Sequence, residues 1–215
     1  MNPFEVILVT LAALLPIVNP LGGAPIFLAM SADLPAEARH RLATVVARNA
    51  LLMLMAALLV GSYVLQFFGI SLAAVRVAGG LVLLGAGWKL LHSGHVEEEG
   101  LPVVEAWERE VGRRGFYPIA FPLTVGPGSI SIAITLGART AGPLQDTAVA
   151  LIANLIGLVI VAMAVYLCYR YASKLIAWLG DTGTNVFLRL SAFIMLCLGV
   201  TILWGGIVGL IETLR

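Results

Sequence analysis

Charged side chains are scarce in this sequence. Asp, Glu, Lys and Arg make up 12% of the 215 residues, whereas hydrophobic residues make up 60%. Soluble domains carry about 25% charged residues, so this chain has too few to cover a surface that faces water. A net charge of +1 also excludes an extended basic surface for nucleic acid. The composition therefore indicates a protein whose solvent is the lipid bilayer.

Cysteine is nearly absent, and so is any sign of a cleaved leader. Cys168 and Cys197 lie inside apolar runs, where they act as small hydrophobic residues and predict neither a disulfide framework nor a metal site. The start of the chain carries no basic residue, and the apolar run that follows contains Pro16, Asn19 and Pro20. We therefore expect that run to be retained as a membrane span.

Long apolar runs recur six times along the chain. A membrane-spanning helix needs about 20 apolar residues. These runs are apolar on every face, which favours helices over the alternating strands of a β-barrel. They cover approximately residues 6–30, 50–68, 70–91, 116–138, 147–169 and 186–211. We therefore expect an all-α membrane protein with six transmembrane helices.

One charged segment divides these runs into two groups of three. Residues 92–115 hold a cluster of Glu and Arg that cannot enter hydrocarbon, so we expect a first three-helix repeat over 1–91, a charged loop over 92–115 and a second repeat over 116–215. Basic residues near span ends mark the cytoplasmic side of a membrane. On the side of the charged segment they are Arg39, Arg41, Arg48, Lys89, Arg109, Arg113, Arg114, Arg170 and Lys174, against Arg139 and Arg215 opposite. This bias predicts a cytoplasmic loop and two periplasmic termini.

The two halves share three landmarks in the same order. The first run of each half contains a Pro/Gly cluster, at residues 16–25 and 121–129. The second elements carry a lone Asn, Asn49 and Asn154, and the third carry a lone Arg, Arg76 and Arg189. Three spans followed by three spans run in opposite directions, so the pattern predicts two inverted repeats.

The Pro/Gly clusters predict that helices 1 and 4 are broken. Proline removes a backbone donor, and glycine leaves helical geometry cheaply. Freed backbone groups in a membrane must be buried in protein or face a water-filled cavity, so two breaks at matching depth predict one shared site near the midplane. Helix amino ends there would bind a carboxylate, and helix carboxyl ends an ammonium group or a cation. The alternative is that the clusters only permit kinks and close packing.

The candidate substrate-binding residues follow from these clusters. They are Asn19, Pro20, Leu21, Gly22 and Gly23 at the first break, Thr124, Val125, Gly126, Pro127, Gly128 and Ser129 at the second, and Asn49 and Asn154. For the two Asn residues, lining the site and pinning helices together are equal alternatives. Arg76 and Arg189 are the charges within apolar runs, and each is either a gate or substrate contact or an anchor that reaches the headgroups.

Membrane-buried carboxylates and histidines are lacking. Every Asp and Glu lies in a loop or near a span end, so coupling to H⁺ or Na⁺ would use backbone carbonyls, water or the substrate's own charge. The same lack disfavours an intramembrane enzyme. We interpret His92 and His95 with Glu97–Glu99 as a solvated loop rather than a metal site, and expect no cofactor. Gly205 and Gly209 could seat a second helix within a protomer or between protomers of a homo-oligomer.

Three stretches together resemble the MarC family of bacterial inner-membrane proteins, within the LysE-like transporter superfamily. They are Asn19-Pro20-Leu21-Gly22-Gly23, Val125-Gly126-Pro127-Gly128-Ser129 and the segment from Gly69 to Gly80 that contains Arg76. The resemblance covers essentially the whole chain. It implies an inner-membrane transporter of small neutral, zwitterionic amino acids such as glycine and alanine, working by alternating access between the broken helices. A channel or an exporter of another small metabolite is the alternative, and an intramembrane enzyme a more distant one.

Overall fold

The computed structural model describes residues 2–92, 107–138 and 144–212, and these residues form helices and short connections without a β-strand. In chain order the elements are α1 (Pro3–Val18), α2 (Pro20–Ala29), α3 (Ala36–Phe67), α4 (Leu72–His92), α5 (Trp107–Phe116), the π-helical turn η1 (Ile119–Thr124), α6 (Pro127–Ala138), α7 (Leu144–Arg170) and α8 (Ala172–Glu212). The all-helical prediction is confirmed. α8 is kinked at Gly180, whose φ of 67° is left-handed.

Four segments in the described part of the chain are long and apolar enough to cross a membrane. They are Pro3–Ala29, Ala36–Phe67, Thr147–Arg170 and Ala192–Glu212. A fifth candidate is the bent pair Arg109–Thr124 and Pro127–Ala138, whose halves meet at 74°. The apolar part of α4, Leu72–Trp88, is shorter than the span of about 20 residues that hydrocarbon requires. Six spans therefore stay a prediction, and four to five candidates are found.

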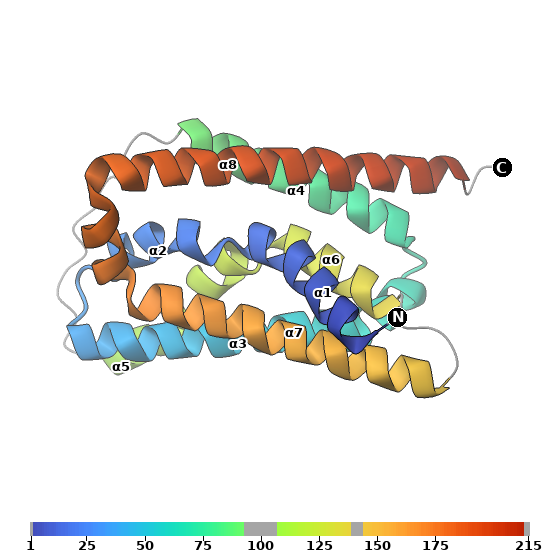
Figure 1. Ribbon diagram of the computed structural model, residues 1–215, viewed down its shortest axis with the longest axis horizontal. Helices are drawn as coiled ribbons and strands as arrows, with labels where there is room; N and C mark the ends of the chain where they lie inside the picture. Colours follow the sequence, from blue (N-terminus) through green and yellow to red (C-terminus); the bar gives the residue numbers. More distant parts are fainter. Residues whose placement is uncertain (1, 93–106, 139–143, 213–215) are drawn as a thin grey trace.

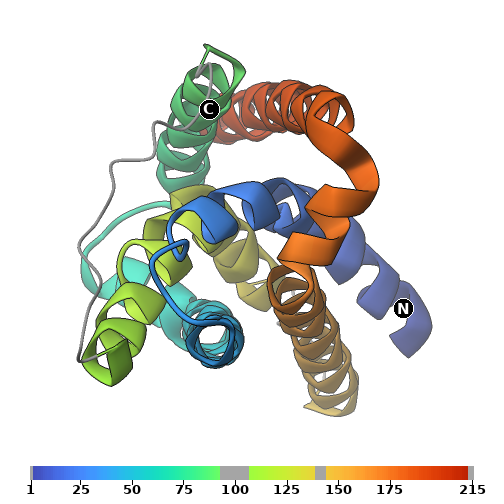
Figure 2. The same cartoon turned by 90° about the vertical axis from the view of Figure 1, so that its left-hand side faces the viewer.

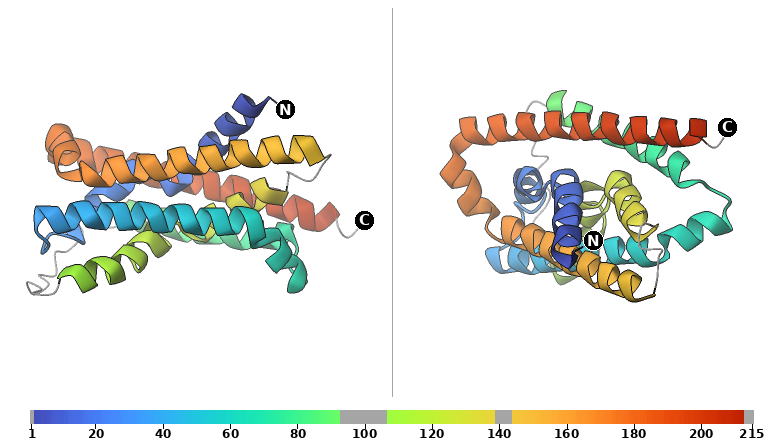
Figure 3. Two further views of the ribbon diagram at one scale, coloured as in Figure 1. Left: turned by 90° about the horizontal axis from the view of Figure 1, so that it is seen from below. Right: turned by 45° about the vertical axis from the view of Figure 1, so that its right-hand side comes forward.

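The broken elements lie in the middle of the bundle. α4 and α8 run side by side along one face of the molecule, whereas α3 and α7 lie on the opposite side (Figures 1 and 2). Figure 3 shows α3 and α7 alongside one another. Between these pairs, α1 and α2 contact α7, and α6 contacts both α3 and α4. The long helices thus flank α2, α6 and the carboxyl end of α1, whereas the amino end of α1 projects from the bundle and exposes Phe4 and Leu8.

Apolar side chains fill the contact between these elements and also cover the outside. Leu14, Phe27, Leu42, Leu54 and Leu158 are fully or almost fully buried. Large side chains such as Phe67, Trp178 and Trp204 are exposed on the outer surface. An apolar exterior is what a protein in lipid requires.

Glycines set the close contact between α4 and α8. A Cβ atom on Gly80 would lie 2.6 Å from the Leu203 amide nitrogen, and one on Gly206 would lie 2.7 Å from the Val77 amide nitrogen. Small residues allow such backbone approach, which is how membrane helices pack without a hydrophobic driving force. Gly209, one of the predicted helix-seating pair, faces Ala73 of α4, whereas nothing within 4 Å faces Gly205.

Part of the expected charged loop is helical. α5 occupies residues 107–116, because Glu110 and Arg114 pair at 2.9 Å across one turn and the buried Val111 gives the helix an apolar contact. Gly115 lies against Val45 of α3. His95 and Glu97–Glu99, interpreted from sequence as a solvated loop, lie outside the described residues.

The basic ends of the helices gather at one end of the molecule. The amino end of α3, the whole of α5, the carboxyl end of α7 and the amino end of α8 lie together at the left in Figure 1, and α1 begins and α8 ends at the right. The left-hand segments carry Arg39, Arg41, Arg109, Arg113, Arg114, Arg170 and Lys174. We refer to this as the basic end.

Candidate functional site

The first helix break is a single residue, Asn19. It adopts left-handed backbone angles (φ 45°, ψ 58°) and joins the end of α1 to the start of α2. Asn is among the few residues that tolerate these angles. Its Oδ1 accepts a hydrogen bond from the Gly22 amide at 3.1 Å, and its carbonyl accepts one from the Gly23 amide at 2.9 Å. The break predicted at this cluster is present, and Asn19 caps it.

Three prolines remove backbone donors around this break. Pro16, Pro20 and Pro25 have no N–H, so the carbonyls four residues earlier lose the donor that a regular helix would supply. Two of those carbonyls, of Pro16 and Leu21, flank the break. Neither carbonyl receives the amide donor that a regular helix would supply four residues later. The side chain of Leu21 itself is exposed.

The second break is longer. Within η1, Phe121 has extended backbone angles (φ −124°, ψ 127°), and Val125 after it is also extended (φ −117°, ψ 94°). The chain then turns by 74° into α6, which begins at Pro127. The first amides of an α-helix have no partner within the helix, and in α6 these belong to Gly128 and Ser129. Their partial positive charge lies at the start of α6, beside the second break.

Tyr169 of α7 contacts both breaks. Its ring stacks on Phe27 of α2 at 4.7 Å, and its hydroxyl lies against Gly23, where a Cβ would collide with it. The same hydroxyl is 2.9 Å from Oγ1 of Thr124 at the end of η1. Because the Thr124 hydroxyl donates its hydrogen to the Ile119 carbonyl at 2.8 Å, it accepts from Tyr169. Residues predicted at the two breaks are therefore joined by one buried phenol.

Close approaches leave little room at these breaks. A Cβ on Gly22 would lie 2.8 Å from Cγ of Asn19, and one on Gly128 would lie 2.5 Å from the side chain of Leu83 in α4. A Cβ on Gly79 of α4 would lie 3.4 Å from the Pro127 carbonyl. α4 thus packs directly against the start of α6.

Comparison with known proteins gives a family match over nearly the whole chain. The family model for MarC family integral membrane proteins matches residues 4–211. This chain belongs to the MarC family. It is 28% identical to inner membrane protein MarC of Salmonella typhimurium, over 99% of both proteins, and 30% identical to a membrane protein of Pyrococcus abyssi, over 97% of this chain and 96% of that protein. No solved structure matches it.

Membership of the MarC family makes this chain an integral membrane protein. Its apolar helices fit a multi-pass arrangement, and the Salmonella relatives are named inner membrane proteins. The family description and the names of these relatives state no enzymatic activity and no transported substrate.

The two predicted Asn residues of this MarC family member lie at different places. Asn154 Oδ1 accepts a hydrogen bond from Thr10 at 2.7 Å, which joins α7 to α1. Asn154 is 15 residues from Tyr169, or about 22 Å along a helix, so this contact fits the helix-pinning alternative. Asn49 Nδ2 donates to the Gly115 carbonyl at 2.9 Å, close to the start of η1.

The two arginines predicted within apolar runs also differ. Arg76 is half-buried, and its Nε donates to Oγ1 of Thr135 in α6 at 3.4 Å. Thr135 donates in turn to the Ser131 carbonyl, whereas the Ser131 hydroxyl is buried without a hydrogen-bond partner in the described structure. Arg189 is exposed on α8. Arg76 therefore contacts the helix that starts at the second break, and Arg189 lies on the outside of the bundle.

Sequence reasoning missed Tyr169, Thr10 and the partners of Arg114. A Tyr at the end of an apolar run is typical of the aromatic belt at the membrane interface, so its spacing gave no reason to place Tyr169 between two breaks. Among the described residues, no group of three or more His, Cys, Asp or Glu could hold a metal ion. The polar groups at the breaks are instead hydroxyls, one Asn amide and backbone carbonyls and amides.

Proposed function

We propose that this protein transports small neutral amino acids of the glycine and alanine class by alternating access. The substrate would bind between the two helix breaks. The observation that carries the proposal is the contact of Tyr169 with both breaks, through Gly23 on one side and Thr124 on the other. Two interrupted helices that meet in the interior are the arrangement that many secondary transporters use to bind substrate.

The backbone chemistry of the breaks supports a zwitterionic substrate. The amides of Gly128 and Ser129 offer partial positive charge to a carboxylate. The carbonyls of Pro16 and Leu21 have lost their helical donors and suit an ammonium group. A ligand with both charges close together would use both sets of groups without any buried charged side chain.

The size of the substrate is limited by the side chains that surround the breaks. Tyr169 occupies the space beside Gly23, and Leu83 occupies the space beside Gly128. Any substrate group that entered the space beside Gly23 or Gly128 would have to displace one of them, and well-packed interiors resist such changes of volume. This supports preference for glycine and alanine over leucine.

Six spans arranged as two inverted three-helix repeats are part of the proposal. It is supported by related contacts in the two halves: α3 contacts α6 of the second half, and α7 contacts α1 and α2 of the first. The protein would lie in a bacterial inner membrane with both termini in the periplasm. We propose no cofactor and no enzymatic activity. Whether transport is coupled to H⁺ or to Na⁺ is a question for transport assays in vesicles.

Counterflow in proteoliposomes tests the proposal. Vesicles loaded with unlabelled alanine should accumulate labelled glycine and alanine transiently, and labelled leucine at least tenfold less. Saturation with substrate and transient accumulation are expected of a carrier. A linear, unsaturable flux of the same amino acids would favour a channel. No flux of any of the three above protein-free vesicles would refute the proposed function.

A further inference from the structure

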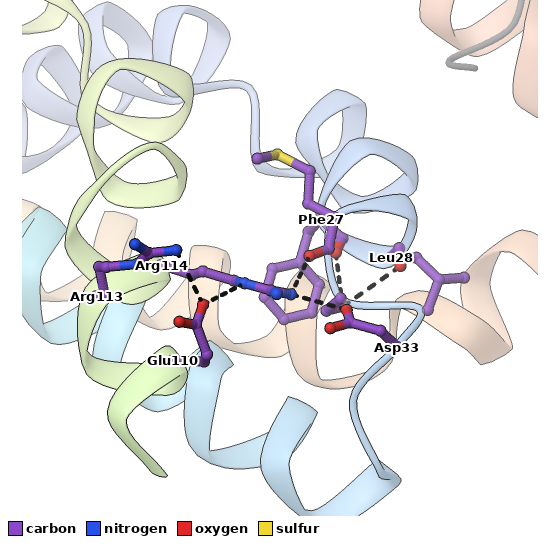
Figure 4. A network of polar contacts seen from close by, with 8 residues as sticks. Phe27, Leu28, Asp33, Glu110, Arg113 and Arg114 are labelled. Atoms are coloured by element: carbon purple, nitrogen blue, oxygen red, sulfur yellow. Dashed lines mark hydrogen bonds and ion pairs between the residues drawn. The ribbon is translucent and has the colours of Figure 1, made fainter. Parts of the chain in front are cut away.

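A buried network of charges joins the two broken elements at the basic end. Nη1 of Arg114 in α5 lies 2.7 Å from Oδ1 of Asp33, which follows the end of α2, and Nε lies 2.9 Å from Glu110 (Figure 4). Nη1 also donates to the Met30 carbonyl at 3.4 Å. The side chains of Asp33 and Arg114 are only 8% and 10% exposed. The network therefore holds α5 against the turn after α2 and is largely shielded from solvent.

The network lies on the same side of both helix breaks. α2 and Asp33 follow the first break, whereas α5 and Arg114 precede the second, so the network joins the two segments that lie on the basic side of both breaks. A segment attached to the bundle through an irregular stretch can change its direction there. If the breaks act as hinges, α2 and α5 are the parts that move, and Arg114 is the link that keeps them together.

The network is also connected to the candidate site. The Ser31 hydroxyl, between Met30 and Asp33, donates to the Phe27 carbonyl at 2.7 Å. Phe27 stacks on Tyr169, which bonds Thr124. α2 and the η1 segment thus touch at two levels, through Tyr169 at the breaks and through Arg114 at the basic end.

One atom of the network lacks a partner. Oδ2 of Asp33 is buried and accepts no hydrogen bond within the described structure. A buried acceptor without a donor is unfavourable, whereas water would satisfy it as soon as α5 moved away. The joined arrangement gains two charge-assisted hydrogen bonds from Arg114 but leaves this oxygen without a donor from the described protein, and the separated arrangement reverses both contributions. Because the hydrogen bonds favour the joined arrangement and the unpaired oxygen favours the separated one, the network allows two alternative states.

We propose that Asp33, Arg114 and Glu110 form a latch that closes the basic end of the pathway, and that the structure shows the closed state at this end. The latch opens when α5 separates from the turn after α2, and a substrate then passes between them. This inference rests on the proposed transport function. The chemistry of the latch, a guanidinium shared by two carboxylates from two moving segments, is independent of which substrate is carried.

Thiol labelling from the basic side tests the latch without any substrate. Ser31→Cys, in a chain with Cys168 and Cys197 replaced by alanine, places a reporter at a position that is 0% exposed beside the latch. Arg114→Gln should raise the labelling rate by an impermeant maleimide at least tenfold in inside-out vesicles. The matched control is Arg113→Gln, because Arg113 contacts the same Glu110 at 3.4 Å but is 77% exposed. It should leave the rate unchanged. Equal rates in both variants would overturn the latch.

Reversible linking of the two segments separates a latch from a merely structural contact. Asp33→Cys with Arg114→Cys, joined by a bifunctional methanethiosulfonate, should lose counterflow at least tenfold and regain it after reduction. The single-cysteine variants treated with the same reagent are the controls. Normal counterflow in the linked protein would refute the latch. If the double variant is inactive before linking, the labelling rate of the Ser31→Cys reporter decides alone. Absence of counterflow in the wild-type protein would instead refute the transport function and leave the labelling result intact.

Discussion

At the scale of single residues, Tyr169 connects two segments that lie a hundred residues apart. Its hydroxyl donates to Thr124 and lies against Gly23, and its ring stacks on Phe27. The Thr124 hydroxyl keeps its own acceptor, the Ile119 carbonyl. Each hydroxyl has one hydrogen to donate. Tyr169 donates to Thr124 and Thr124 donates to the Ile119 carbonyl, which fixes the orientation of both side chains.

Tyr169→Phe removes this link and little else. The ring and its stacking on Phe27 remain, so we expect the free energy of unfolding to fall by about 0.5–1.5 kcal/mol, the usual net value of one hydrogen bond. We also expect weaker substrate binding, because η1 is no longer held to α2. Denaturation in detergent and equilibrium binding of labelled alanine measure the two effects. Tyr171→Phe is the control, since Tyr171 is exposed. Identical behaviour of the two variants would contradict the role given to Tyr169.

At the scale of helices, two Asn side chains hold elements together. Asn154 joins α7 to α1 through Thr10, whose single hydroxyl hydrogen is shared between Asn154 Oδ1 at 2.7 Å and the Val6 carbonyl at 2.9 Å. Asn49 joins α3 to the carboxyl end of α5, immediately before η1. The first contact lies away from the breaks, and the second lies next to one of them. Their removal should therefore have different consequences.

Asn154→Ala should lower stability without altering the site. Thr10 retains its bond to Val6, so we expect a loss of about 1 kcal/mol in the free energy of unfolding and unchanged substrate affinity. Asn49→Ala deprives the Gly115 carbonyl of its donor beside η1, and should reduce both stability and affinity. Thermal unfolding and binding of labelled alanine are the measurements. A tenfold loss of affinity in Asn154→Ala would return Asn154 to the substrate site.

The helix breaks are predictable from sequence because they follow from local backbone rules. The long-range contacts between helices are not predictable in this way. Pro20 and Pro127 lack the amide hydrogen that would continue a preceding helix but suit the first position of a new one, and Asn19 tolerates left-handed angles, so both breaks follow from neighbouring residues. Which side chain would lie between the breaks depends on how α7 packs on α1 and α2, and no spacing encodes that. The charges of α5 predict a loop because they dominate its composition, whereas the buried Val111 and the Glu110–Arg114 ion pair help to stabilise it as a helix.

At the scale of the whole molecule, one end carries most of the basic residues. The positive-inside rule assigns that end to the cytoplasm. A cysteine at Glu98, within the charged segment, should therefore resist an impermeant thiol reagent in intact spheroplasts and react after lysis. Ser71→Cys, in the exposed connection before α4 at the opposite end, should react in intact spheroplasts. The reverse pattern would place the termini in the cytoplasm.

Glycine substitutions decide whether the two breaks together form one binding site. A side chain at position 22 would displace the Asn19 cap, and one at position 128 would collide with Leu83, whereas Gly85 has nothing within 4 Å. Valine is the sharpest probe because its branched Cβ fills space and resists rearrangement.

The measurement is equilibrium binding of labelled glycine and alanine to purified, monodisperse protein. We predict that Gly22→Val and Gly128→Val each weaken binding at least tenfold, while Gly85→Val binds as the wild type does. Wild-type affinity in both Gly22→Val and Gly128→Val would contradict the shared site and reduce the two clusters to packing kinks.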